Sequence, residues 1–584
     1  MCGIFGVIGG KPLDIKNSVQ KLRHRGPDDI GFFSGKSISL GFTRLSIIDL
    51  SKNGAQPMCN EKKDVWIVFN GEIYNFLDLK SKLKKHQFKS SSDTEVLIHG
   101  YEEWGIEGLL ERIDGMFAFC LYDEKKGLCY LARDRVGKKP LYLYRASSYI
   151  AFSSEVKAFF ELSSFKFEID KPMFGLWLGF SYLPDNSGTI IKNVSKVAPG
   201  HFIMVGLEDH SVEDRSFWSL KESRVSENPR TFEESVQILE KLLVESVKER
   251  LVSDVPLGIL LSGGLDSSLI TAIACRNSKE KINTINIAFE NSNIDESFYA
   301  DNVANYCGTN HLDLKVKIDD AYGEFRDSIE IFDDLSTIDG GLFSTYLMSK
   351  EVRKQGIKVV LVGEGADEVF GGYSWFQFSQ FPFSLMPDIL KSCGYYYAIM
   401  RTISNPVFRG YPLVLNRMLN EISKGYFKKA QYYEITHSLP NHYCMKLDKG
   451  TSAAGIEARA PFLDYKVVEE AFNMPRQYLL RGGTASLKSS NEKYILREIA
   501  KKYLPANIYT RKKKGGMLPT YDILNCGLKY DGDTIIENNI LAAVFGRSYL
   551  TDLIKSTPKI KIIKWEREWI LWKCLVFSLW YEKF

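Results

Sequence analysis

The chain lacks the features typical of membrane, secreted and nucleic-acid-binding proteins. Its most apolar stretch, residues 569–581, contains Lys573 and is shorter than the roughly 20 residues that cross a bilayer. We therefore expect a buried helix there rather than an interfacial anchor. Ten cysteines are scattered without a CxxC pair, and residues 1–10 lack a basic start, which favours free thiols, no signal peptide and a cytoplasmic location. The formal net charge is only +4, so composition favours neither a nucleic-acid nor a membrane partner.

At 584 residues the chain is too long for one core and predicts two or three domains. The first 200 residues contain short apolar runs separated by Gly, Asn and Asp turns, which predict an α+β layered domain. We expect strands over residues 4–8, 41–48, 65–70, 116–122, 128–133 and 149–153, and helices over 76–85 and 93–104. A polar stretch at 208–228 suggests domains at 1–207 and 230–584.

The second half has a different pattern. A long amphipathic helix over residues 232–251 precedes three apolar runs, 256–261, 282–289 and 357–362, which have helical segments between them. Runs that are apolar at every position suit strands buried on both faces, so they predict an α/β domain with a doubly wound parallel sheet. Beyond Tyr373 the chain is mostly helical and rich in aromatic residues.

Cys2 follows the initiator methionine directly. Removal of Met1 would leave a cysteine with both a thiol and a free α-amino group. The unperturbed pKa of that amine is roughly 8 and that of the thiol about 8.5, so nucleophile and base could share one residue. The alternative interpretation is a small buried thiol in the first strand.

A phosphate site is predicted after the first buried strand. Ser262, Gly263, Gly264, Leu265, Asp266 and Ser267 join that strand to a helix, and free backbone N–H groups at such a junction bind anions. Asp266 would repel phosphate unless Mg²⁺ bridged them. Asp367 follows the third strand and would reach the same edge of the sheet. The alternative is an ordinary strand-to-helix turn with serine caps.

Three later stretches contain charges that could support this site: residues 457–464, the helix start at Lys493, and the basic turn 511–514. A charge run is usually a solvated face. Near a site that releases pyrophosphate, its cations would instead neutralise the leaving group.

In their order along nearly the whole chain, these motifs resemble the glutamine-hydrolysing asparagine synthetase family. The first half is similar to class II, N-terminal-nucleophile glutaminases, which implies an αββα sandwich. The second half resembles the ATP-pyrophosphatase, or PP-loop, domain of the adenine nucleotide alpha hydrolase-like fold, with a helical C-terminal part.

The resemblance implies the following roles in the glutaminase half. Cys2 is the nucleophile, Arg44 takes the glutamine carboxylate, and Asp93 takes the substrate ammonium. Asn70 and Gly71 supply the oxyanion hole, and Glu72 belongs to the glutamine-binding segment. The loop from Arg23 to Asp28 (RHRGPD) matches the family's loop near that site.

In the synthetase half, Ser262–Ser267 match the pyrophosphate loop, and Asp266 and Asp367 the Mg²⁺ ligands. Glu364 matches a catalytic residue, and Lys493 the lysine that stabilises the adenylating transition state. The residues expected near ATP are Leu260, Ser262, Gly263, Gly264, Asp266, Ser267, Ile287, Val362 and Gly363. The implied reaction hydrolyses glutamine, passes ammonia through an interior tunnel and amidates an acyl-adenylate, releasing AMP and pyrophosphate. Family analogy permits a homodimer.

The acceptor region departs from the family. Asp334 and Asp339 can be aligned with family acids, but no arginine stands nearby for a substrate carboxylate. Further departures are Leu335, Gly340, Gly341, Val362, Ser452, Gly455 and Gly516. We expect aspartate as the acceptor, with asparagine as product; the alternative is another carboxylate, such as a uronic acid of a surface-polysaccharide precursor. A non-catalytic scaffold or sensor is less favoured, because the reactive positions are all present.

Overall fold

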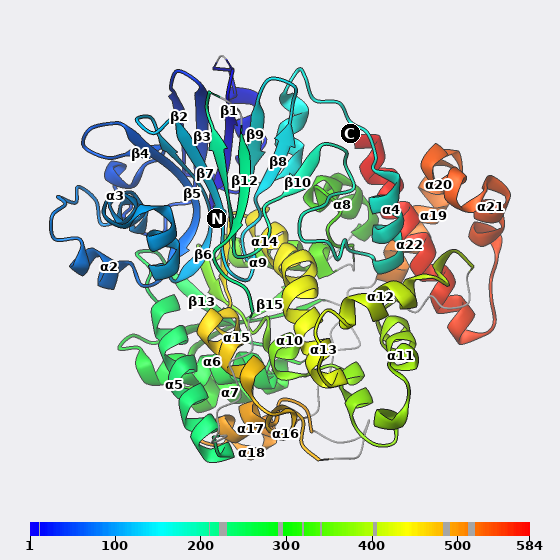
Figure 1. Cartoon of the computed structure of the whole chain (residues 1–584). Helices are drawn as coiled ribbons and strands as arrows, with labels where there is room; N and C mark the ends of the chain where they lie inside the picture. Colours follow the sequence, from blue (N-terminus) through cyan, green and yellow to red (C-terminus); the bar gives the residue numbers. More distant parts are fainter. Residues whose placement is uncertain are drawn as a thin grey trace.

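Two six-stranded antiparallel sheets form the N-terminal part of the chain (Figure 1). The computed structural model describes residues 1–10, 12–208, 211–220, 230–289, 296–317, 320–338, 341–400, 406–482, 491–511 and 520–583. The first sheet has the order β10 (Val194–Lys196), β8 (Tyr142–Arg145), β9 (Ile150–Ser153), β1 (Gly3–Ile8), β3 (Ile38–Arg44), β2 (Asp29–Ser34). The second has the order β12 (Val212–Ser216), β11 (His201–Gly206), β7 (Leu128–Arg133), β6 (Gly115–Asp123), β5 (Val65–Ile73), β4 (Met58–Cys59).

The two sheets pack face to face and carry helices on their outer faces. Ile8, Phe42, Val68 and Cys120 belong to the core between the sheets. Helices α2 (Phe76–Lys82) and α3 (Asp93–Arg112) cover the second sheet. Helices α1 (Lys16–Gln20), α4 (Lys171–Phe180) and α22 (Lys561–Lys583) pack in the core of the first sheet. This is the predicted αββα sandwich.

The six strands expected from the sequence are present, with ends shifted by a few residues. The sequence analysis does not predict β2, β4, β8, β10, β11 or β12, several of which are short or half exposed. The second sheet continues to β12, which pairs with β11. It therefore extends beyond residue 207, where the first domain was expected to end.

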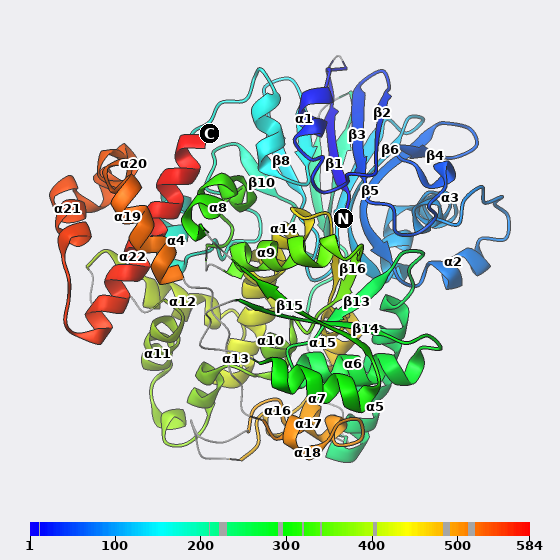
Figure 2. The same cartoon turned by 180° about the vertical axis from the view of Figure 1, so that it is seen from behind.

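A five-stranded parallel sheet organises the second half, in the order β15 (Asn310–Val316), β14 (Asn283–Phe289), β13 (Leu257–Leu260), β16 (Val359–Leu361), β17 (Glu457–Arg459). Figure 2 shows α5 (Phe232–Arg250), α6 (Leu265–Asn277) and α7 (Ser297–Cys307) on one face. Helices α9 (Gly341–Lys354) and α14 (Cys444–Ser452) lie on the other, toward the sandwich. Helix α5 begins with a capping box between Thr231 and Glu234. The doubly wound sheet is as predicted; β15 and β17 are additional.

The rest of the described chain is mainly helical, as expected. Helix α13 (Tyr426–Tyr433) runs through a π-helical segment, Glu434–Tyr443, into α14. The stretch 569–581 lies in α22, and its Ile570–Trp580 portion is buried, which confirms the buried-helix prediction. Among the described helices, none is both long and apolar enough to cross a bilayer. The other helices are α8 (Ala321–Asp327), α10 (Ala366–Phe370), α11 (Asp388–Met400), α12 (Tyr411–Leu419), α15 (Tyr465–Asn473), α16 (Arg476–Leu479), α17 (Tyr494–Ala500), α18 (Ala506–Tyr509), α19 (Thr520–Glu537), α20 (Asn539–Phe545) and α21 (Arg547–Lys555).

Candidate functional site

Cys2 stands immediately before β1 and borders a small cavity of about 40 Å³. The cavity is lined from both sheets and from the start of α3, and its walls include the predicted residues Cys2, Arg44, Gly71, Glu72 and Asp93. Burial raises the pKa of the Cys2 thiol. Burial also lowers the pKa of the amino group at Met1 to about 5, so an amine at this end of the chain is neutral near pH 7.

Asn70 and Gly71 are neighbours in β5; Gly71 lines this cavity, whereas Asn70 does not. Asn70 is fully buried, and neither its Nδ2 nor its Oδ1 has a hydrogen-bond partner among the described residues. A buried, unsatisfied amide is costly, so its presence points to a ligand. Gly71 has φ +156°, and a Cβ there would lie 2.0 Å from the carbonyl oxygen of Met116. Only glycine fits at this position.

Arg44 and Asp93 place opposite charges at the cavity. The Arg44 guanidinium donates to the carbonyl oxygens of Asp49 and Ser51, the latter at 2.8 Å. The Asp93 carboxylate accepts from the backbone N–H of Ile73 at 2.9 Å. Burial raises the pKa of Asp93 to about 6. A ligand with a carboxylate at one end and an ammonium at the other would complement this pair.

Arg25, in the loop 23–28, is completely buried and contacts the backbone of Cys2. Its Nε donates to the Cys2 carbonyl at 3.0 Å. Its Nη1 donates to Glu155 at 2.7 Å and to Ser452 at 3.1 Å, and its Nη2 donates to Asp448 at 2.8 Å. Arg25 therefore connects the predicted nucleophile to α14 of the second half.

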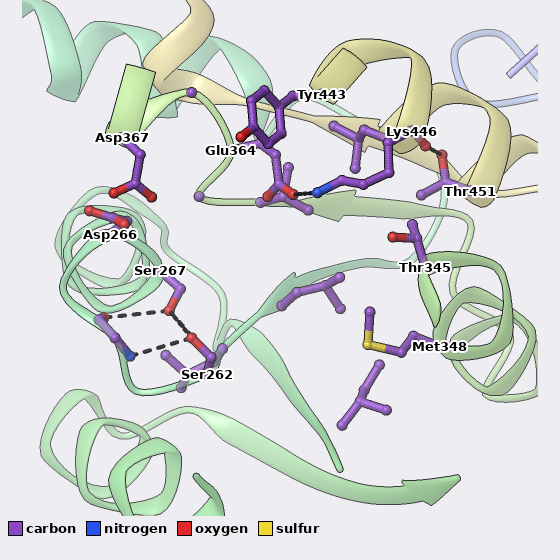
Figure 3. Close-up of a pocket in the computed structure, with 18 of the residues that line it drawn as sticks. Ser262, Asp266, Ser267, Thr345, Met348, Glu364, Asp367, Tyr443, Lys446 and Thr451 are labelled. Atoms are coloured by element: carbon purple, nitrogen blue, oxygen red, sulfur yellow. Dashed lines mark hydrogen bonds and ion pairs between the residues drawn. The ribbon is translucent and has the colours of Figure 1, made fainter. Parts of the chain in front are cut away.

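The loop between β13 and α6 forms the predicted anion site. Gly263 has φ +67°, and a Cβ there would lie 2.5 Å from Tyr299, so the loop can make this turn only with glycine. Gly264 is the N-cap of α6. The hydroxyls of Ser262 and Ser267 lie 3.2 Å apart across the loop (Figure 3). The N-terminus of α6 thus opens toward the cavity, as a phosphate-binding junction requires.

Asp266 and Asp367 face each other at the carboxyl ends of β13 and β16 (Figure 3). Lys493 Nζ lies 2.7 Å from Asp266 and 2.8 Å from Asp367. Burial opposes the charge of Lys493, but the two carboxylates outweigh it and raise its pKa. Two carboxylates that converge on one cationic atom, beside a phosphate loop, are a donor set that suits Mg²⁺. The residues therefore fit the metal inferred from the sequence.

The cavity at this site has a volume of about 370 Å³. Leu260, Ile287, Val362 and Gly363 supply apolar wall beside the phosphate loop. On the far side, α9 and the Glu434–Ser452 segment contribute hydroxyl and apolar groups, with Lys446 3.4 Å from Glu364 (Figure 3). The lining residues from these two elements are Thr345, Met348, Ser349, Tyr443, Lys446, Leu447 and Thr451.

Two known families account for both halves. The family model for asparagine synthase matches residues 238–582, and that for a glutamine amidotransferase domain matches residues 1–218. The chain belongs to the asparagine synthase family. It is 29% identical over 635 residues to asparagine synthetase [glutamine-hydrolyzing] 1 of Bacillus subtilis, covering 100% of this chain and 96% of the relative. It is 31% identical over 545 residues to asparagine synthetase B of Escherichia coli, covering 88% and 81%. These relatives are ligases, and the resemblance stated from the sequence is confirmed.

The structure gathers most of the predicted residues of the asparagine synthase domain around one cavity. Gly263 and Lys493 do not line it: Gly263 packs against Tyr299, and Lys493 contacts Asp266 and Asp367, which do line it. Asp334 does not line the cavity, because it is buried in an ion pair with Lys449. Arg511 donates to the Gly263 carbonyl at 2.9 Å and pairs with Glu296. The predicted residues Lys512, Lys513, Lys514, Gly516, Asp339 and Gly340 lie outside the described residues.

Sequence reasoning missed the wall that the helices contribute. Tyr443, Leu447 and Thr451 follow a helical spacing along one face of α14 and the preceding segment; that periodicity is the signal that could have found them. Residues 457–464 were expected to support the phosphate site, but Glu457, from β17, lines the Cys2 cavity, and Arg459 pairs with Glu72 at 2.9 Å. No local pattern marks these contacts, because they join the two domains.

A third, smaller cavity of about 20 Å³ lies between the two sites of the asparagine synthase chain. Met1 borders it, and Leu447 borders both this cavity and the large one. Its other lining residues are Met116, Lys138, Lys139, Cys444, Asp448, Ala458, Ala460 and Leu463. This cavity therefore shares one wall residue, Leu447, with the synthetase cavity and is bordered by Met1, the residue before Cys2.

Proposed function

We propose that this protein hydrolyses glutamine at Cys2 and uses the released ammonia to amidate a carboxylate that ATP has activated as an acyl-adenylate, with release of AMP and pyrophosphate. The observation that carries the proposal is the pairing of two complementary sites in one chain. One places a thiol between Arg44 and Asp93, and the other places Lys493 between Asp266 and Asp367 at a phosphate loop.

In the glutaminase step, glutamine lies with its carboxylate at Arg44 and its ammonium at Asp93. The Cys2 sulfur attacks the side-chain amide carbon, and the Asn70 amide and the Gly71 N–H stabilise the oxyanion. Collapse of the intermediate releases ammonia and leaves a thioester, which water hydrolyses to glutamate. The unsatisfied Asn70 amide supports its place in this step.

The proposed base is the α-amino group of Cys2 itself, freed when Met1 is removed. That amine takes the thiol proton and later returns it to the leaving ammonia. Burial favours a neutral amine at this end of the chain, and a neutral amine is the form that can accept a proton.

In the synthetase step, the acceptor carboxylate attacks the α-phosphorus of ATP, and pyrophosphate leaves at the Ser262–Ser267 loop. Mg²⁺ held by Asp266 and Asp367 would neutralise phosphate charge there. Lys493 lies at the same point and stabilises the charge that develops as the phosphate bond breaks. Ammonia then displaces AMP from the acyl carbon beside Glu364, and an amide forms.

The small cavity at Met1 supports passage of ammonia between the sites. Its lining residues are apolar except for Lys138, Lys139 and Asp448, and Leu447 borders both it and the synthetase cavity. A closed route keeps ammonia away from bulk water, which would protonate it to ammonium. Ammonium has no lone pair and is not nucleophilic.

The acceptor we favour is aspartate. Lys446 is the basic side chain among the described residues that line the large cavity, and it can take the second carboxylate of aspartate. The second candidate is a uronic acid: the hydroxyls of Thr345, Ser349 and Thr451 in the same wall suit a sugar.

Because all ten cysteines are free thiols, we place the protein in a reducing, cytoplasmic compartment.

An acceptor panel tests the proposal. The protein is incubated with glutamine, ATP and Mg²⁺ together with aspartate, glutamate, a free uronic acid or a nucleotide-linked uronic acid, and AMP, ADP and glutamate are measured. AMP formation that depends on aspartate supports asparagine synthesis, and dependence on a uronate supports the second candidate. Formation of ADP instead of AMP contradicts the adenylate route. A Cys2→Ala variant that is active with ammonium but not with glutamine isolates the first site.

A further inference from the structure

The N-terminal end of α22 exposes an unusual group of large apolar side chains. Ile560, Ile562, Ile563 and Trp565 are 61%, 54%, 45% and 39% exposed. Among the described isoleucines and tryptophans, these four are the ones with such exposure. Contiguous exposed apolar side chains mark an interaction site more often than isolated ones do.

Lysines alternate with these side chains. Between residues 553 and 565 the chain has four lysines, Lys555, Lys559, Lys561 and Lys564, and no acidic residue. This segment alone carries a formal charge of +4, as large as the net charge of the whole chain. Lys561 Nζ lies 4.6 Å from the centre of the Trp565 ring, and Lys564 lies 3.8 Å from Glu568 on the next turn.

The rest of the helix fixes this end in place. From Ile570 to Trp580, α22 is buried in the core of the first sheet, and α19 and α21 pack against it. In Figure 1 the start of α22 lies with α20 and α21 at the outer edge of the molecule, away from the sheets. Residues 559–565 are all exposed, so the end of a firmly anchored helix projects into solvent.

We propose that residues 559–565 dock on the surface of an anionic lipid bilayer. The surface of an anionic bilayer can bind both the apolar side chains and the lysines. The isoleucines and Trp565 enter the boundary between headgroups and acyl chains, and the lysines remain among the anionic headgroups. A second copy of the chain fits less well, because a two-fold contact between these segments would bring the three lysines of one copy against the three of the other. Nucleic acid would match the lysines and leave the isoleucines in water.

This proposal departs from the expectation, drawn from the sequence, that the protein has no membrane partner; the apolar stretch on which that expectation was partly based is buried from Ile570 to Trp580. The segment proposed here precedes that stretch and neither spans nor enters the bilayer core. It would hold the whole enzyme at the surface peripherally and reversibly, as a single short amphipathic contact does.

Co-sedimentation of the full-length protein with vesicles tests this proposal. Vesicles of phosphatidylcholine with phosphatidylglycerol are compared with vesicles of phosphatidylcholine alone, at near-physiological ionic strength. One variant reverses the charges, Lys559→Glu/Lys561→Glu/Lys564→Glu, and another removes apolar contact, Ile562→Ser/Ile563→Ser/Trp565→Ser. The matched control, Lys36→Glu/Lys62→Glu/Lys84→Glu, reverses three exposed lysines on the other domain. Glutaminase activity and melting temperature confirm that each variant is folded.

We expect binding to the anionic vesicles, a loss of roughly a hundredfold in the partition coefficient for the charge reversal, a clear loss for the serine variant, and no loss beyond a fewfold for the control. Absence of binding by the wild-type protein, or equal binding by all four proteins, overturns the proposal. A concentration-dependent dimer that the serine variant abolishes would assign the surface to a second copy instead. Binding of double-stranded DNA as tight as that of vesicles would assign it to nucleic acid.

Discussion

Replacing Arg25 with methionine should weaken the contact between the two domains. It should also lower glutamine hydrolysis at Cys2 more than it lowers the synthetase reaction. Arg25 is fully buried and forms four hydrogen bonds, two of them to the carboxylates of Glu155 and Asp448. Methionine has a similar length but no donor, so both carboxylates would remain buried with one cation fewer. The Cys2 carbonyl would also lose its hydrogen bond.

The size of the effect follows from the burial of the pair. Removing one partner of a buried ion pair costs about 3–5 kcal/mol, because the other charge stays desolvated. For a domain of about 200 residues this lowers the melting temperature by roughly 6–20 °C. Arg215→Met is the control: Arg215 pairs with Glu107 and Glu213 but is 43% exposed. An exposed pair contributes at most about 1 kcal/mol.

Thermal unfolding and two activity assays measure the outcome. We expect Arg25→Met to lose most of its glutamine-dependent activity, because Cys2 is no longer held, while ammonium-dependent synthesis persists below the new melting temperature. Arg215→Met should resemble wild type in all three assays. If Arg25→Met melts within about 2 °C of wild type and hydrolyses glutamine normally, the buried network does not position Cys2.

Three further predictions concern single sites. Gly71→Ala should abolish glutaminase activity while ammonium-dependent synthesis persists, because its Cβ would overlap the Met116 carbonyl; Gly127→Ala, where no atom lies within 4 Å, is the glycine control. Burial raises the pKa of Asp93 to about 6, so Asp93 becomes protonated as the pH falls through 6. Because a protonated Asp93 cannot hold the substrate ammonium by charge, kcat/KM for glutamine should fall over the same range. A flat profile of kcat/KM from pH 5 to 8 would exclude Asp93 as the ammonium acceptor. Burial lowers the pKa of Lys573 to about 7, so the native state should gain stability as the pH rises from about 7 toward the unfolded value near 10.4. In the Lys573→Met variant the melting temperature should no longer rise with pH over this range. If it rises as in the wild type, Lys573 is not the group responsible.

The elements that could be predicted from the sequence are those whose own residues determine them. The strands β13 and β16 have no polar side chain, since a central parallel strand is covered on both faces; β14, besides its polar positions, is apolar at Ile285, Ile287, Ala288 and Phe289. The edge strands β15 and β17 were missed for the opposite reason. Residues 310–315 are exposed or half exposed, and β17 consists of Glu457, Ala458 and Arg459. Its buried charges pair with each other, and Arg459 also pairs with Glu72 in the other domain.

The same distinction holds for the sites. Cys2 and the glycine loop are both recognised locally: the glycine loop because its backbone geometry requires glycine at Gly263, and Cys2 because a thiol directly follows the initiator methionine. Lys446 and Glu457 come from segments with no such requirement, and only the packing of the domains brings them to the cavities. In the acceptor region, Thr345 lines the large cavity, but Asp334, which can be aligned with a family acid, does not. The ion pair with Lys449 holds Asp334 in the core instead.

Helix α14 is the element that both sites share. Successive side chains on a helix are 100° apart, so one turn can face two directions. Lys446, Leu447 and Thr451 face the synthetase cavity, whereas Asp448 and Ser452 face Arg25 and, through it, Cys2. A rigid helix between the sites fixes their separation, and the intervening cavity at Leu447 is bounded by the same turn. Helix α14 thus contacts both sites and helps to set their separation, together with the Arg459–Glu72 pair.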